Sequence, residues 1–381
     1  MRFALAVVIA ASLLIAPASA GAAVPASFFG VMSDGALFAP TVDLGSELAL
    51  MRSSGVGSTR VAVQWRALQP QPGVLDFAAF DAFVLATARA GVQILPVVLG
   101  TPAWAARDPS NAASPPKDPR QYGDVLTALV QRYGPAGTLW AQHPEVTRVP
   151  IRQWQVWNEP DLGKYWAAKD WAPGYVALLR AARSAIKAAD PSAKVVLAGL
   201  TNRSWVDLRR VYDAGGGRLF DLAAVHPFSR RVPNVLKIVT LVRREMRRHG
   251  DARKPLVLSE LSWSSGRGHS TFNYGWETTE KGQALHLASA LARLAARRQA
   301  DRIAGVYWYT WLSPAIGGKD SFDYSGLRRL DASGHPVSKP ALAAYRIVAR
   351  RFERGSARGN LGLARGCQRV TELGRAAFVC E

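Results

Sequence analysis

Two glutamates are the first candidates for chemistry, because each follows a short apolar run. Glu159 comes after Trp154–Trp157 and Asn158, and Glu260 closes the run that begins at Leu256. Two carboxyl groups, one protonated and one ionised, can cleave a glycosidic bond by protonating the leaving oxygen and attacking the anomeric carbon. A lone glutamate is as readily a helix N-cap, a surface carboxylate or the partner of a helix arginine. The pair is therefore the candidate, rather than either member.

Eight short runs rich in Val, Ile and Leu have the composition of strands buried on both faces of a parallel sheet. We predict these strands at Phe28–Met32, Ser58–Gln64, Gln93–Leu99, Ile151–Trp157, Lys194–Ala198, Leu222–His226, Leu256–Glu260 and Ile303–Tyr309.

Amphipathic stretches separate these runs, and glycines or an Asp-Pro pair end several of them. We predict helices at Val42–Ser53, Phe77–Ala90, Gln121–Tyr133, Pro173–Ala189, Trp205–Ala214, Asn234–His249, Thr279–Arg298 and Pro340–Arg351.

Eight strand–helix units in order predict an α/β protein with a (β/α)₈ barrel. An open doubly wound sheet is the competing fold, but it would more often carry a Gly-rich phosphate turn after its first strand, and none is present. No repeat or low-complexity linker divides the chain. We expect one catalytic barrel over residues 24–352, followed by a basic tail over residues 353–381.

The carboxyl ends of barrel strands carry the catalytic residues in this fold. Glu159 and Glu260 end the fourth and seventh predicted strands, from which their side chains can converge across the barrel mouth. Further polar and aromatic side chains lie at or just after the ends of other strands, namely Arg60, Trp104, His226, Trp263 and Trp308.

These residues resemble a known group of enzymes. The run Trp157-Asn158-Glu159-Pro160 is similar to the Asn-Glu signature of glycoside hydrolase clan A, and Leu258-Ser259-Glu260 resembles that clan's nucleophile strand. The resemblance extends over residues 28–350. Thr101-Pro-Ala-Trp104 and the run from Trp308 to Thr310 look closest to family 39 of the clan, with family 5 next.

The resemblance implies a role for each matching residue. Glu159 would be the acid/base and Glu260 the nucleophile of a retaining glycosidase. Asn158 would donate to the sugar 2-hydroxyl, and Arg60 would hydrogen-bond Glu260 and keep it ionised. His226 would line the −1 subsite and Trp308 would form its floor.

Each of these roles has a structural alternative. Arg60 could be a structural ion pair within the barrel, and His226 a satisfied core histidine. Trp308 could fill the barrel while Trp311 stacks on the sugar. Trp104 and Trp263 are candidates for further sugar contacts or for loop packing, as are three other tryptophans on the same face, Trp65, Trp166 and Trp276.

One position departs from the clan's pattern. Many clan members place a tyrosine, bonded to the nucleophile, shortly after strand six. Here that place holds Phe228, which cannot donate a hydrogen bond. Tyr274 or Tyr309 would have to substitute, and otherwise the nucleophile is tuned differently. A substrate carried over from family 39 is correspondingly weakened.

The two ends of the chain point to export. Arg2, the apolar run Phe3–Ile15 and the small residues Ala18-Ser19-Ala20 form a signal-peptide pattern, which we assign to residues 1–23. A retained N-terminal anchor is the alternative. Cys367 and Cys380 are close enough in sequence to form a loop-closing disulfide in an oxidising compartment, and two free thiols are the alternative. We expect a secreted or cell-envelope protein without a membrane span.

The charge distribution and the motifs limit the classes of partner that we expect. The net charge is +20, and removal of the signal peptide leaves +19 because Arg2 is its only charged residue. The excess is spread over several helices, and no nucleic-acid motif is present, so we expect no nucleic-acid partner. No Cys/His spacing indicates a metal site, and the expected chemistry needs no cofactor.

We therefore expect a secreted retaining O-glycoside hydrolase with an oligo- or polysaccharide substrate. The alternative is a catalytically silent barrel that binds polysaccharide of the cell envelope. An acidic glycan is a weaker option suggested by the charge. The residues do not predict the sugar, the linkage, endo or exo action, or the oligomeric state.

Overall fold

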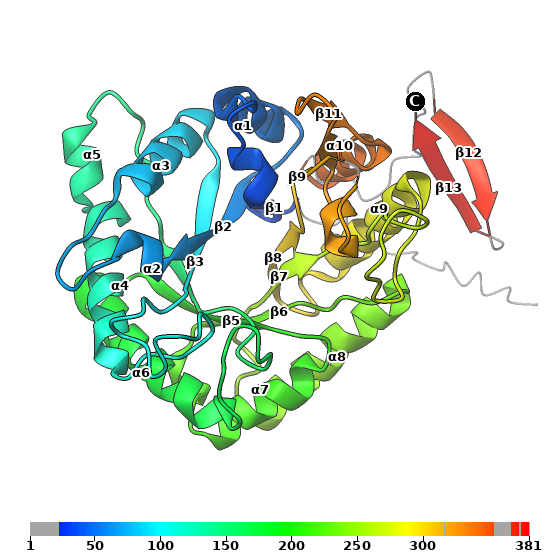
Figure 1. Cartoon of the computed structure of the whole chain (residues 1–381). Helices are drawn as coiled ribbons and strands as arrows, with labels where there is room; N and C mark the ends of the chain where they lie inside the picture. The colour runs from blue at the N-terminus through cyan, green and yellow to red at the C-terminus, as the bar shows by residue number, and fades with distance from the viewer. Residues whose placement is uncertain (1–22, 316, 354–366, 373–374, 381) are drawn as a thin grey trace, which may run out of the picture.

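The chain folds into a closed barrel of eight parallel strands surrounded by helices, as the computed structural model shows (Figure 1). The structure describes residues 23–315, 317–353, 367–372 and 375–380. The barrel strands are β1 Phe29–Ser33, β2 Ser58–Gln64, β3 Gln93–Leu99, β4 Gln153–Val156, β5 Lys194–Leu200, β6 Leu222–Val225, β7 Leu256–Leu261 and β8 Ile303–Trp308. The sheet closes because β1 pairs in parallel with both β2 and β8. The predicted fold class is confirmed.

Eight longer helices follow the strands in sequence and form the outer layer (Figure 1). They are α1 Leu44–Ser53, α3 Ala78–Ala90, α4 Pro119–Tyr133, α6 Trp171–Ala189, α7 Ser204–Asp213, α8 Val232–Arg248, α9 Glu280–Arg297 and α10 Pro340–Glu353. Their buried side chains and the outward-facing strand residues form one large core. No helix within the described residues is long and apolar enough to cross a membrane.

Short elements complete the chain. Two helices, α2 Trp65–Leu68 and α5 Thr138–Gln142, and three 3₁₀ turns, Gly35–Phe38, Gly217–Leu219 and Ser321–Tyr324, lie between the barrel elements. A small sheet after β8 contains β9 Leu312–Ser313, β10 Arg328–Leu330 and β11 Pro336–Ser338.

The C-terminal part that the structure describes is a two-stranded hairpin of β12 Cys367–Glu372 and β13 Arg375–Cys380. The hairpin lies outside the barrel, beside α9 and α10 (Figure 1). Its antiparallel register pairs Cys367 with Cys380. The side chains of these two residues, like residues 1–22 of the predicted signal peptide at 1–23, fall outside the described part. The disulfide and the cleavage therefore stay predictions.

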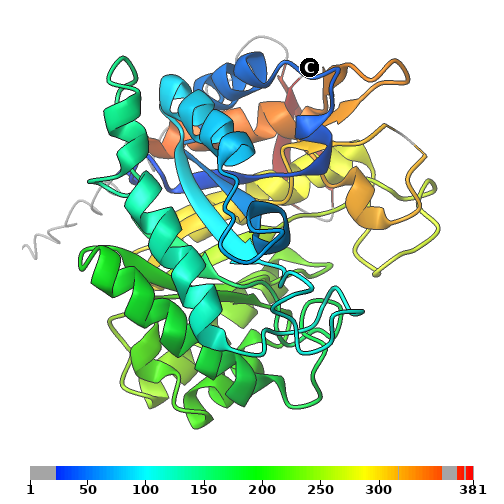
Figure 2. The same ribbon diagram turned by 60° about the vertical axis from the view of Figure 1, so that its left-hand side comes forward.

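The barrel interior is layered. At the amino-terminal end of the strands, a small apolar cluster that includes Leu95, Val257 and Tyr307 fills the inside. Above it the interior becomes polar, with Arg60, Gln155 and Ser259 each no more than 1% exposed. The loops after β3, β4, β7 and β8 gather on one side of the barrel (Figure 2). The polar layer therefore lies between an apolar plug and the loop-covered mouth.

Candidate active site

Two strand ends place the glutamates at the barrel mouth. Glu159 lies shortly after the end of β4, and Glu260 is the penultimate residue of β7. Both carboxyl groups are largely buried, yet both line a cavity of about 620 Å³. One carboxylate oxygen of each lies within 4.8 Å of the other. The predicted convergence of the two side chains is therefore present in the structure.

The backbone before Glu159 adopts an unusual conformation. Trp157 and Glu159 have positive φ angles of 70° and 41°, in the left-handed region that side chains other than glycine rarely adopt. The Trp157 amide donates to the carbonyl of Val98 on β3, and the Glu159 amide donates to the carbonyl of Gly199 on β5, at 3.0 and 3.1 Å. The neighbouring strands thus hold a strained turn that aims Glu159 into the cavity.

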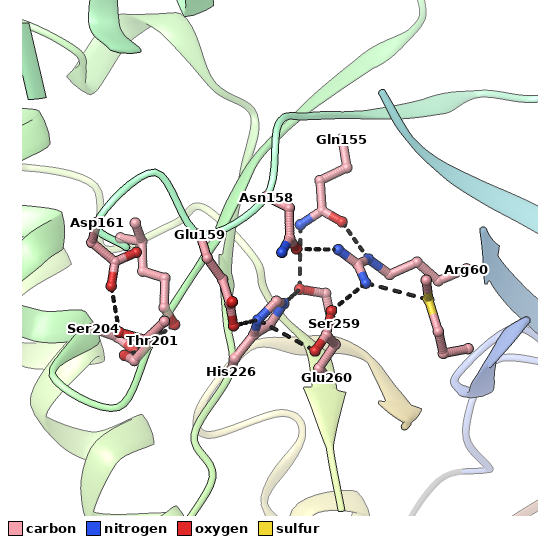
Figure 3. A network of polar contacts seen from close by, with 12 residues as sticks. Arg60, Gln155, Asn158, Glu159, Asp161, Thr201, Ser204, His226, Ser259 and Glu260 are labelled. Atoms are coloured by element: carbon pink, nitrogen blue, oxygen red, sulfur yellow. Dashed lines mark hydrogen bonds and ion pairs between the residues drawn. The ribbon is translucent and has the colours of Figure 1, made fainter. Parts of the chain in front are cut away.

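The Arg60 guanidinium organises the side of the site near Glu260 (Figure 3). Its Nη1 donates to Glu260 Oε1 at 2.6 Å, its Nη2 to Asn158 Oδ1 at 2.7 Å and its Nε to Gln155 Oε1 at 2.6 Å. The bond to Glu260 is charge-assisted and sets a fixed positive charge against this carboxylate. Because the Asn158 oxygen accepts from Arg60, its amide NH₂ is left as a donor for a ligand.

His226 connects the two glutamates (Figure 3). Its Nδ1 lies 2.7 Å from Glu159 Oε1 and 3.6 Å from Glu260 Oε2, while its Nε2 lies 3.0 Å from Ser259 Oγ. Complete burial lowers the pKa of His226 to about 4, although the charge of Glu260 opposes this. The ring is therefore neutral at neutral pH and adds no positive charge that would ionise Glu159.

Burial has the opposite effect on Glu159. It raises the pKa of this carboxyl to about 7, against the weaker opposing charges of Lys164 and Arg60. A neutral imidazole that faces Glu159 and a guanidinium that holds Glu260 give the two carboxyl groups different surroundings. The arrangement can hold a proton on Glu159 beside a Glu260 carboxylate that is paired with Arg60, and acid-assisted displacement requires such a difference between the two groups.

The same three side chains could also hold a metal ion. Within the described residues, Glu159, His226 and Glu260 are the group whose potential ligand atoms lie within 4.8 Å of one another. Arg60 already neutralises one of these carboxylates at 2.6 Å. Nothing in the chemistry just described depends on a metal.

Of the predicted tryptophans, Trp308 and Trp263 do not reach the cavity. Trp308 and Trp263 are fully buried, and their indole Nε1 atoms donate to the carbonyls of Ser325 and Arg230. Side chains alternate along a strand, so Trp308 points outward while its neighbours Tyr307 and Tyr309 point inward. Stacking on a sugar by Trp308 therefore does not fit this structure, and Trp308 belongs to the large core between the barrel and the helices.

The other two candidate stacking residues also pack internally. Trp104 is half-buried, donates to the carbonyl of Gln69 and lies edge-to-face on Trp65 with ring centroids 5.9 Å apart. Trp311, the suggested substitute for Trp308, is fully buried and donates to Glu47 Oε2 at 2.7 Å. Trp276 lines the cavity.

Asp34 occupies a position that the sequence reasoning missed, and it is the partner of Tyr309. Both line the cavity, and the Tyr309 hydroxyl is hydrogen-bonded to the Asp34 carboxyl. Thr310 Oγ1 also bonds to Asp34, and burial raises the pKa of that carboxyl. Asp34 directly follows β1, so its position at a strand end was the available signal.

Tyr274 and Tyr309, the two proposed substitutes for the clan's tyrosine, direct their hydroxyls to carboxyl groups other than that of Glu260. The hydroxyl of Tyr309 bonds Asp34, and the hydroxyl of Tyr274 donates to Asp320 Oδ2 at 3.1 Å. Phe228 lines the cavity and stacks on Trp276 with ring centroids 5.6 Å apart. Arg60 is thus the hydrogen-bond donor that the structure gives to the Glu260 carboxylate.

One known protein family matches a part of the chain that precedes both glutamates. Glycoside hydrolase family 42, described as beta-galactosidase, matches residues 40–136, about a quarter of the chain. No curated protein matches the sequence.

Solved structures share the fold. A family 39 glycoside hydrolase from the gut symbiont Bacteroides cellulosilyticus WH2 has a TM-score of 0.63 at 20% identity, covering 86% of this chain and 64% of its own. A monomeric beta-xylosidase from Caulobacter crescentus CB15 has 0.63 at 19%, covering 86% and 69%. The GH53 catalytic domain of Ignisphaera aggregans has 0.58 at 19%, covering 85% and 97%. These likenesses show that the chain shares the (β/α)₈ barrel fold of these glycoside hydrolases.

The shared fold agrees with the resemblance to clan A, and the match to family 42 covers only residues 40–136. The chain spans less than two thirds of the family 39 protein named above, and identities near 20% show a common fold rather than a common substrate. Membership of family 39 therefore stays a prediction, as do the sugar and the catalytic residues.

Proposed function

We propose that this protein is a glycosidase of clan A that cleaves its substrate with retention, with Glu159 as acid/base and Glu260 as nucleophile. The separation of the two carboxyl groups carries the proposal, since their nearest candidate ligand oxygens lie within 4.8 Å. Retaining enzymes place the two groups about 5–5.5 Å apart, whereas inverting enzymes leave about 6.5–9.5 Å for a water molecule. The short separation favours direct attack by Glu260.

The proposed reaction has two steps. In the first, the Glu159 carboxylic acid gives its proton to the glycosidic oxygen while the Glu260 carboxylate attacks the anomeric carbon, which releases the leaving group and forms a glycosyl ester. In the second, the Glu159 carboxylate takes a proton from water, whose oxygen attacks the anomeric carbon and releases Glu260. Each residue ends as it began.

The surrounding residues support these steps. Arg60 would keep Glu260 ionised, and Asn158 would offer its amide NH₂ to the sugar 2-hydroxyl. His226 would act as a positioning residue that fixes the Glu159 side chain from the side of Ser259. The silent-barrel alternative has no comparable support, because a binding function requires neither the raised pKa of Glu159 nor the ion pair at Glu260.

Azide rescue tests the roles. We expect Glu260→Gly to lose activity on aryl glycosides by on the order of 10⁴-fold, and azide to restore turnover with a glycosyl azide of inverted configuration. Glu159→Ala should instead yield the azide with retained configuration. The exposed Glu145 offers a control, and Glu145→Gln should keep full activity. Undiminished hydrolysis by Glu260→Gln would refute the assignment.

We further propose that the protein is exported, with residues 1–23 removed and Cys367 joined to Cys380. The signal-peptide pattern supports export. The register of the terminal hairpin, which sets Cys367 opposite Cys380, is compatible with a disulfide.

A further inference from the structure

An aromatic wall borders the cavity on the side of the loops after β6, β7 and β8. We use this name for Phe228, Phe272, Tyr274, Trp276 and Phe322. Their rings form a continuous series. Tyr274 lies 5.2 Å from Phe272 and 5.1 Å from Phe322, and Trp276 lies 5.1 Å from Phe322 and 5.6 Å from Phe228, measured between ring centroids. All except Phe272 line the cavity.

The aromatic wall runs from the floor of the site to solvent. At the inner end, Phe322 contacts Tyr309, with ring centroids 5.4 Å apart. At the outer end, Phe272 is 59% and Tyr274 is 43% exposed. Neighbouring large apolar side chains exposed at the mouth of a site indicate a surface that a ligand covers. The catalytic cavity is continuous with this surface, so the ligand is a part of the same substrate.

The two ends of the cavity differ in access. The end at Arg60, Val97 and Met32 is closed, since these side chains are buried within the barrel. The end at Tyr274 and Lys164 is open. A sugar unit bound over Glu260 at the closed end must direct the rest of the molecule toward the open end and its aromatic wall.

The charges of the cavity oppose those of the whole chain. Among the residues that the structure describes, five carboxyl groups line the cavity, and so do two cations, Arg60 and Lys164. Arg60 is already bonded to Glu260, Asn158 and Gln155. Lys164 is exposed at the rim and lies 4.8 Å from the Tyr165 ring centroid. A sugar carboxylate in this cavity would face carboxyl groups without a free buried cation to pair it.

We propose that the substrate is an uncharged sugar chain, and that the sugar beyond the cleaved bond stacks on the aromatic wall at Tyr274 and Phe272. This rests on the proposed hydrolytic function and specifies its substrate. The C–H face of a pyranose ring is apolar and flat, and it packs on an aromatic ring while its hydroxyls stay in water. The acidic-glycan option suggested by the net charge is accordingly disfavoured inside the site.

Kinetics with two kinds of leaving group test the stacking. A glycosyl fluoride needs only the closed end, whereas a neutral oligosaccharide also needs the wall. For Tyr274→Ala and Phe272→Ala, we expect kcat/KM on the oligosaccharide to fall about tenfold more than on the fluoride. Tyr274→Phe keeps the aromatic ring and should therefore retain the kcat/KM of the wild type on the oligosaccharide. Phe38 is 48% exposed and does not line the cavity. Phe38→Ala is therefore the matched control, and it should leave kcat/KM unchanged on both substrates.

Binding to the inactive Glu260→Gln protein tests the charge. Calorimetry should give tighter binding, by about tenfold or more, for a neutral oligosaccharide than for an oligouronide of the same length, and Tyr274→Ala should remove the advantage of added sugar units. Preference for the oligouronide, or for an alkyl glycoside over every oligosaccharide, would overturn the proposal. Equal losses on fluoride and oligosaccharide would overturn the stacking. If the wild type hydrolyses neither the fluoride nor any aryl glycoside, the hydrolytic function itself fails.

Discussion

At the scale of single residues, the site depends on two carboxyl groups kept in different states. Glu159 is buried against a neutral imidazole, and Glu260 is bonded to a guanidinium that is 1% exposed. Low solvent access raises the pKa of the first, and a fixed cation is paired with the second. Two residues of the same type thus acquire different chemistry from their neighbours.

The pH dependence of the rate follows from Glu159. Burial raises its pKa to about 7, and the proposed acid must carry its proton in the first step. We expect kcat/KM for a substrate with a poor leaving group to fall tenfold per pH unit above about 7. A substrate with a very good leaving group needs no protonation and should lose this alkaline limb. An alkaline limb of the same position for both substrates would contradict the role of Glu159.

The same pKa predicts a cost in stability. The native pKa of Glu159 exceeds its ordinary value of 4.5, so the native state binds the proton more tightly than the unfolded state. The corresponding stability is present below about pH 4.5 and is lost as the pH rises through about 7, by about 3 kcal/mol. Glu159→Gln should therefore be more stable than the wild type at pH 8 and little changed at pH 4. Denaturant unfolding at both values checks this, and an equal difference at both would refute it.

At the scale of elements, β5 fixes the position of His226. An alanine Cβ at Gly199 would lie 2.0 Å from His226 Nε2, far inside any van der Waals contact. Gly199→Ala should push the imidazole away from Glu159, cost about 1–3 kcal/mol and lower kcat on the order of 10²-fold. On β8, a Cβ at Gly305 meets nothing closer than 3.5 Å, so Gly305→Ala is the matched control. Equal effects of the two changes on kcat would contradict a positioning role for His226.

The elements themselves were largely predictable. The bounds of β2 and β3 match the predicted ones, and the other barrel strands differ by a few residues at their ends. Strands buried on both faces have a composition that stands out locally. The small sheet of β9, β10 and β11 was not foreseen, because its pairing depends on distant contacts, such as the buried ion pair of Arg328 with Glu47.

Site residues were predictable where position alone defines them. Glu159, Glu260 and Arg60 lie where the predicted strands put them. Trp308 was predicted at the cavity because tryptophan commonly stacks on sugars, but side chains alternate along β8 and Trp308 points away from the cavity. The left-handed backbone at Trp157 and Glu159 had no signal in the sequence, since the bonds to β3 and β5 that hold it join residues far apart in the chain.

At the scale of the whole molecule, charge is divided between the outside and the catalytic cavity. The chain carries a net charge of +20, whereas carboxyl groups outnumber cations around the cavity. A basic exterior can attract an anionic polymer without that polymer fitting the acidic site. Net charge therefore bears on which polymers this protein attracts, and the charges of the cavity bear on which substrate the proposed active site would accept.

The proposed export has consequences for both ends of the chain. The N-terminal pattern predicts passage into an oxidising compartment, where Cys367 and Cys380, opposite each other in the hairpin, would lose two hydrogens and join. We expect intact-mass analysis of exported protein to show an N-terminus near residue 24 and no thiol that reacts with an alkylating agent before reduction. The double change of both cysteines to serine should leave kcat unchanged, because the hairpin lies outside the barrel beside α9 and α10. An uncut N-terminus together with two reactive thiols would refute export, whereas a lower kcat would show that the hairpin supports the barrel.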